Sequence, residues 1–124
     1  MTNNGIILLN KSQSVQRQRF TVMHELGHYL LGHVGSDPRF RDSGRTEEEQ
    51  EADRFAVGCL MPACVLGALH ATTAKEIAAL CNVSMQAAEI RSRRMQILLA
   101  RNKFLTHPLE RQVFEQFKHF INNQ

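Results

Sequence analysis

The alternation of apolar and polar residues divides the chain into helical stretches separated by polar turns. In most of the chain, apolar side chains recur every three to four residues, the spacing that places them on one face of an α-helix. The predicted helical segments are residues 14–33, residues 46–61, a helix pair within residues 73–103, and residues 108–122. The pattern therefore predicts a mostly helical protein with a core of about five helices.

Residues that favour helix starts stand where these segments begin. Serine and threonine side chains can accept a hydrogen bond from the first free backbone N–H groups, and proline suits the first helical position. Thr46 and Thr73 each have a glutamate three residues later, which is the spacing of a capping box. The other starting residues are Ser12 or Ser14, Ser84 and Pro108.

Residues 5–10, with the sequence GIILLN, form the one stretch whose pattern favours a β-strand. The run is short, rich in Ile and Leu, and bounded by Gly5 and Asn10. A single strand cannot satisfy its own backbone hydrogen bonds. We expect it to pair with a hairpin elsewhere, with a second chain in an oligomer, or with a segment outside this sequence. The predicted fold class is thus α+β, with a short N-terminal strand in a sheet that this chain can leave incomplete.

The first predicted helix contains the pattern HExxH, formed by His24, Glu25 and His28. Residues four apart on a helix lie about 40° apart around its axis, so both histidines can bind one metal ion. Glu25 on an adjacent face can handle the proton of a water molecule held there. A random chain of this composition shows the pattern with a probability of about one in fifty. Two surface histidines beside an ordinary glutamate are therefore the alternative, and the surrounding sequence has to decide.

A zinc ion bound by two histidines needs a third protein ligand. One class of zinc peptidases takes it from a glutamate on a second helix, with an aspartate one turn later, and Glu49 and Asp53 have this spacing. Glu49 is our preferred ligand, and Asp53 would orient one of the histidines. Glu48 or Glu51 could replace Glu49, because an acidic run defines its own register poorly. The simpler interpretation of this run is the negative first turn that any helix favours.

His33 is a rival third ligand that the spacing disfavours. It follows His28 by five residues, so on an unbroken helix it would point about 140° away from it. We interpret it as a histidine at the end of the helix. Residues 34–45, rich in glycine, serine and charge, are predicted to be a loop beside the site.

Composition predicts one soluble domain over residues 1–124. The net charge is +3, which permits an acidic partner without requiring one. The three cysteines, Cys59, Cys64 and Cys81, are an odd number without an export signal ahead of them, so we expect free thiols and a cytoplasmic protein. No apolar run approaches the roughly 20 residues needed to cross a bilayer.

The pair of helices in residues 73–103 also fits a helix-turn-helix. Arg91, Arg93 and Arg94 could then contact phosphates. A solvated basic face is the simpler interpretation, and we do not expect direct DNA binding.

Three separate blocks resemble the ImmA/IrrE family of metallopeptidases. Residues 17–31 read RQRFTVMHELGHYLL, residues 49–56 read EQEADRFA, and residues 60–62 read LMP. The resemblance implies a zincin-like core with zinc bound by His24, His28 and Glu49. Known members are cytoplasmic zinc endopeptidases that cleave DNA-binding repressors and so control mobile elements or the damage response. Relatives commonly have more strand before the segment matching residues 6–10, so the chain is either a minimal core or a piece of a longer protein.

These placements predict a zinc-dependent endopeptidase in which Glu25 is the catalytic base. Glu25 would take the proton of the attacking water and pass it to the leaving amine. The predicted partner is a protein substrate, a transcriptional repressor. The alternative is a non-catalytic regulatory module that uses the same fold to bind a repressor or DNA through residues 91–103.

Overall fold

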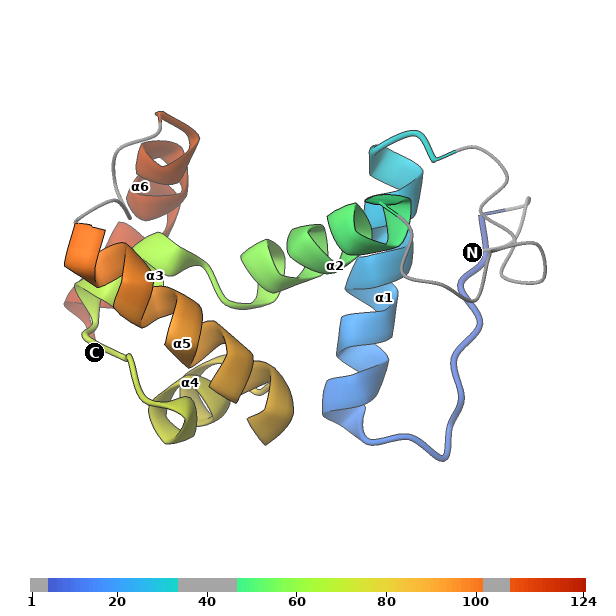
Figure 1. Ribbon diagram of the computed structural model, residues 1–124, viewed down its shortest axis with the longest axis horizontal. Helices are drawn as coiled ribbons and strands as arrows, with labels where there is room; N and C mark the ends of the chain where they lie inside the picture. Colours follow the sequence, from blue (N-terminus) through green and yellow to red (C-terminus); the bar gives the residue numbers. More distant parts are fainter. Residues whose placement is uncertain (1–4, 34–46, 102–107) are drawn as a thin grey trace. The chain divides into compact units, whose positions relative to one another are not determined.

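The computed structural model describes residues 5–33, 47–101 and 108–124, and the regular secondary structure within them is entirely helical (Figure 1). Within these ranges six helices, α1 to α6, follow one another along the chain. The chain divides between Leu60 and Met61 into two compact units, which are described separately below. The predicted helical core is confirmed, with one helix more than the sequence pattern suggested.

The first unit is built from α1 (Val15–Leu30) and α2 (Glu47–Leu60), which pack against each other. Ser14 caps α1 by accepting a hydrogen bond from the backbone N–H of Arg17 at 3.1 Å. Where the two helices cross, small residues let their backbones approach: Gly27 on α1, and Ala52 and Ala56 on α2, are buried. The predicted loop at residues 34–45 and the predicted cap Thr46 lie outside the described residues.

Helix α1 ends at Leu30, three residues before the predicted end at residue 33. Gly32 adopts a left-handed conformation with φ of 73°. Its N–H donates to the carbonyl of Tyr29 at 3.2 Å, and the N–H of His33 donates to the carbonyl of His28 at 3.0 Å. This pair of bonds is a Schellman motif, which reverses the chain over the last helical turn. His33 is therefore folded back toward the helix.

The strand predicted over residues 5–10 is wrong for the described structure. Residues 6–10 have no regular secondary structure, and Ile6, Leu8 and Leu9 are exposed. Among the described residues there is no second extended segment to complete a ladder, and a lone strand cannot pair its backbone groups. The sheet predicted for an α+β fold is likewise not seen among the described residues.

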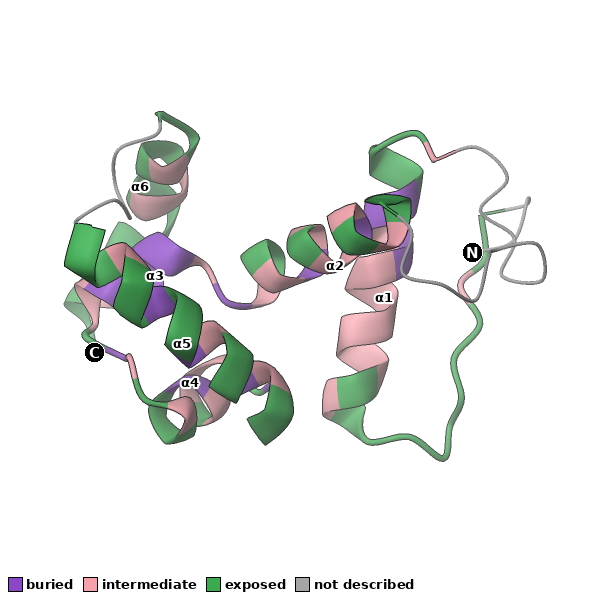
Figure 2. Ribbon diagram, in the orientation of Figure 1, coloured by how far each residue is buried: buried purple, intermediate pink, exposed green. Residues whose placement is uncertain are grey.

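The second unit is organised around the short helix α3 (Ala63–Ala68). The residues from Ala63 to Gly67 are all buried, and Figure 2 shows buried ribbon along α3. Helices α5 (Met85–Arg101) and α6 (Pro108–Asn122) pack on α3, and α4 (Ala74–Cys81) packs on α5. The largest fully buried side chains of this unit are those of Met61, Leu66, Ile77, Met95 and Cys64.

The capping residues predicted for the second unit occupy the positions expected of them. Thr73 accepts from the N–H of Glu76 at 3.2 Å, which is the first bond of a capping box, and its hydroxyl donates to the carboxylate of Glu76 at 2.7 Å. Ser84 accepts from the N–H of Ala87 at 3.1 Å. Local hydrogen bonds of this kind are determined by neighbouring residues, so the sequence pattern predicts them well.

Arg91 of α5 has a structural contact in the second unit. Its Nε donates to the backbone carbonyl of Met61 at 3.0 Å, and burial lowers the pKa of its guanidinium. The next residue, Ser92, donates its hydroxyl to the carbonyl of Thr72. These bonds hold α5 to the segments on either side of α3. Arg93 and Arg94, by contrast, are exposed.

The described helices contain none that is long and apolar enough to cross a membrane. All three cysteines are free thiols: Cys64 is buried, Cys81 is half-buried and Cys59 is exposed.

Candidate metal centre

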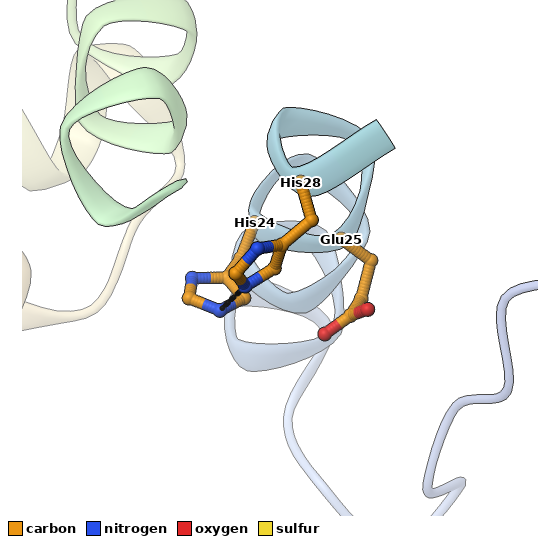
Figure 3. Close-up of side chains that lie close together, drawn as sticks. All are labelled: His24, Glu25 and His28. Atoms are coloured by element: carbon orange, nitrogen blue, oxygen red, sulfur yellow. Dashed lines mark hydrogen bonds between the residues drawn. The ribbon is translucent and has the colours of Figure 1, made fainter. Parts of the chain in front are cut away.

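Two histidines on one face of α1 form the base of the site. Because His24 and His28 are four residues apart, their rings meet edge to face, with centroids 4.7 Å apart. Their Nε2 atoms are 3.1 Å apart (Figure 3). The side chain of His28 is 2% exposed and that of His24 is 14% exposed. Helix α1 by itself thus brings two imidazole nitrogens to one largely buried point.

Glu25 extends from the adjacent side of the same helix turn. Figure 3 shows its carboxylate close to the two rings but not between them. The residue is 8% exposed, and one ligand-type atom from each of His24, Glu25 and His28 lies within 4.8 Å of the others. The three side chains could therefore hold a metal ion as a group.

Helix α2 places Glu49 directly against both histidines. Its Oε2 atom is 3.0 Å from Nε2 of His24, and its Oε1 atom is 3.0 Å from Nε2 of His28. The two rival glutamates lie elsewhere, because Glu48 is exposed and Glu51 faces His33. Among the three carboxylates considered from the sequence, the structure brings Glu49 to the point where the two imidazoles converge.

Asp53, one turn beyond Glu49 on α2, contacts the other nitrogen of His24. Its Oδ1 atom is 2.8 Å from Nδ1 of His24. A carboxylate only accepts hydrogen bonds, so Nδ1–H of His24 donates to Asp53, and this contact leaves Nε2 as the nitrogen that can face a metal ion. The ring of Phe20 is stacked on the His24 ring, with their centroids 6.5 Å apart. The orientation of His24 is thereby fixed from two directions.

His33 contacts the site in a way that the sequence reasoning missed. Its Nδ1 atom is 2.7 Å from Nδ1 of His28, and its Nε2 atom is 3.3 Å from Oε2 of Glu51. The prediction that His33 points away from His28 assumed an unbroken helix, whereas the Schellman motif at Gly32 turns the chain back. The glycine directly before His33 was the sequence signal that could have revealed this turn.

The converging atoms fit a metal ion by their chemistry. In the metal-binding form of His24, which carries its proton on Nδ1, Nε2 and both oxygens of Glu49 are acceptors, and acceptors packed this closely repel one another unless a cation lies among them. Ligands held at about 2.0–2.1 Å by a tetrahedral ion lie roughly 3.3 Å from one another. The observed separations of 3.0 to 3.1 Å approach that value. Two imidazoles and a carboxylate also form the N/O set that zinc accepts in catalytic sites.

A buried HExxH pair on one helix with a carboxylate from the next defines a metallopeptidase-like centre. The sequence profile of the IrrE N-terminal-like domain family matches residues 1–93. The chain belongs to this family, which confirms the resemblance found in the sequence and indicates a zinc-metallopeptidase-like domain. The curated proteins and the solved structures that were compared with the chain gave no match.

Proposed function

We propose that this chain is a zinc-dependent endopeptidase with His24, His28 and Glu49 as its metal ligands. The observation that carries the proposal is the convergence of two Nε2 atoms and one carboxylate within 3.0 to 3.1 Å. These groups come from two helices, so their meeting does not follow from the HExxH spacing alone. Membership of the IrrE N-terminal-like family supports the same chemistry independently.

The ion would supply Lewis acidity, polarising the scissile carbonyl and making water nucleophilic near neutral pH. Glu25, nearly buried beside the ligands, takes the proton of the attacking water. It then returns that proton to the leaving amine. Asp53 holds His24 in the tautomer that directs a lone pair inward. Each of these roles uses an atom whose position the fold of α1 and α2 determines.

The proposed substrate is a DNA-binding repressor protein, so that cleavage would derepress a mobile element or a stress response. This part of the proposal rests on the resemblance to the ImmA/IrrE metallopeptidases. Direct DNA contact is not required for it. Arg91, one of the three arginines that a DNA-binding interpretation needs, donates to a backbone carbonyl within its own unit.

Metal analysis of the purified chain tests the ligand set. We expect one zinc per chain in the wild type, loss of zinc in Glu49→Ala, and retention in Glu48→Ala as the matched control. Full zinc content in Glu49→Ala would contradict the assignment of Glu49 and move the ligand to another glutamate of α2.

Cleavage is tested against purified DNA-binding repressors, beginning with any that is encoded next to the gene of this chain. Mass spectrometry of the zinc-loaded reaction should find one defined cut that is missing when Glu25→Gln replaces the wild type. Binding of zinc and repressor without any cut would contradict the endopeptidase and favour a non-catalytic regulatory module.

A further inference from the structure

We infer that His33 is a positioning residue for the metal site and that Glu51 sets the direction of its hydrogen bonds. The inference rests on the proposed function, because it assigns a role toward a ligand of that site. The observation behind it is a series of contacts between three side chains, those of His28, His33 and Glu51, that leads away from the metal centre. Nδ1 of His28 is 2.7 Å from Nδ1 of His33, and Nε2 of His33 is 3.3 Å from Oε2 of Glu51.

The direction of these hydrogen bonds follows from Glu51, the side chain farthest from the metal centre. A carboxylate can only accept, so Glu51 selects the tautomer of neutral His33 with its proton on Nε2. Nδ1 of His33 then holds a lone pair and must accept a hydrogen bond. Only Nδ1–H of His28 can donate at that contact. His28 is thereby held with its proton on Nδ1 and a bare Nε2 atom, the form that binds a metal ion.

Burial makes this arrangement specific. The side chain of His33 is 7% exposed and that of His28 is 2% exposed, so water competes little for either nitrogen of the contact. Glu51 is 38% exposed and reaches the outer side of His33 from α2. The contacts therefore lead from the buried ligand His28, through the buried ring of His33, to Glu51 at the protein surface.

Each of the two histidine ligands is then oriented by a carboxylate that acts on its Nδ1 atom. Asp53 accepts directly from Nδ1 of His24, whereas Glu51 acts on Nδ1 of His28 through the ring of His33. Both carboxylates belong to α2, and they stand two residues apart. The same helix that supplies the third ligand thus also orients the other two.

The first test reads the tautomers directly in the wild-type chain. With histidine labelled by ¹⁵N and zinc bound, two-bond ¹H–¹⁵N correlations should show His28 protonated on Nδ1 and His33 protonated on Nε2. A neutral His33 with its proton on Nδ1 would overturn the inference. No variant is needed, so a folding defect cannot obscure this result.

The second test compares zinc affinities by competition with a chromophoric chelator. His33→Leu removes the acceptor and should weaken zinc binding about 10- to 100-fold. His33→Asn should retain most of the affinity, because its amide oxygen occupies the place of Nδ1. Glu51→Ala should weaken binding less than His33→Leu, and Glu48→Ala, on the same helix turn but exposed, should leave it unchanged.

The outcomes separate this inference from the proposed function. Glu49-dependent zinc binding that is equally tight in the wild type and in His33→Leu would overturn the role of His33 and leave the peptidase proposal standing. A wild-type chain that binds no zinc would overturn both.

Discussion

Gly27 of α1 lies so close to Phe55 of α2 that a Cβ atom at Gly27 would be 2.9 Å from Cδ1 and 3.1 Å from Cβ of Phe55. The Cβ atom of Phe55 is fixed to its backbone, so a change of rotamer cannot relieve the second contact. The absence of a side chain at residue 27 therefore sets the distance between α1 and α2. Because the ligands come from both helices, the same contact determines whether Glu49 reaches the histidines.

Gly27→Ala is predicted to lower both stability and metal affinity. Overpacking costs about 1–3 kcal/mol, and the better helix propensity of alanine offsets roughly 1 kcal/mol of that cost. Because the added methyl group pushes α1 and α2 apart, the substitution should reduce the free energy of zinc binding more than the free energy of unfolding. Urea denaturation and chelator competition measure the two effects.

Gly58→Ala is the matched control for this substitution. Gly58 also lies within α2, but a Cβ atom there meets nothing within 4 Å. Alanine at that position should stabilise the chain by about 0.5–1 kcal/mol and leave zinc affinity unchanged. Equal behaviour of the two variants would contradict a specific role for the Gly27–Phe55 contact.

Glu25→Gln is predicted to retain zinc and to lose turnover. Glutamine has nearly the same shape as glutamate but cannot accept a proton, and general base catalysis contributes about 10²- to 10⁴-fold. Zinc content and the rate of repressor cleavage should be measured on the same preparation. Cleavage at the wild-type rate would exclude Glu25 as the base, whereas loss of zinc would show it to be a ligand.

Asp53→Ala is predicted to weaken zinc binding without abolishing it. Loss of the acceptor at 2.8 Å frees the His24 ring to rotate and to change tautomer, at a cost of about 10- to 100-fold in affinity. Asp53→Asn, whose amide oxygen can still accept, should lose less. If Asp53→Ala removed zinc as completely as Glu49→Ala does, Asp53 would be a ligand itself.

The Cys64 thiol is predicted to make the free energy of unfolding depend on pH in the alkaline range. Burial and the neighbouring Glu110 carboxylate raise its pKa from 9.0 to about 11. The folded chain thus binds this proton more tightly than the unfolded chain. The resulting stabilisation is complete below pH 9 and is lost as the pH rises to about 11, amounting to at most about 2–3 kcal/mol.

Urea denaturation at pH 8 and pH 11 measures this loss. Cys64→Ala has no thiol to titrate, so its stability should fall less over the same range, and the difference between the two chains isolates the effect. As a further check, a thiol reagent at pH 8 should modify the exposed Cys59 of the folded chain well before the buried Cys64. If the free energy of unfolding fell equally with pH in the wild type and in Cys64→Ala, the assignment of the effect to the Cys64 thiol would be contradicted.

Some features of this protein follow from the sequence because they depend on neighbouring residues. The pairing of His24 with His28 requires only one helical turn, and the caps at Ser14 and Thr73 use hydrogen bonds that span three residues. The helical segments follow from the apolar spacing in the same way. Local geometry of this kind is nearly independent of the rest of the fold.

Other features were decided only by tertiary structure. The acidic run on α2 allowed several glutamates to face the site, and the rotation of α2 on α1, set at Gly27 and Phe55, turned Glu49 toward the histidines and Glu51 toward His33. The predicted strand at residues 5–10 depended on a partner that the described residues do not supply. The sequence by itself determined which residues could bind a metal ion, and the packing of two helices decided which of them meet.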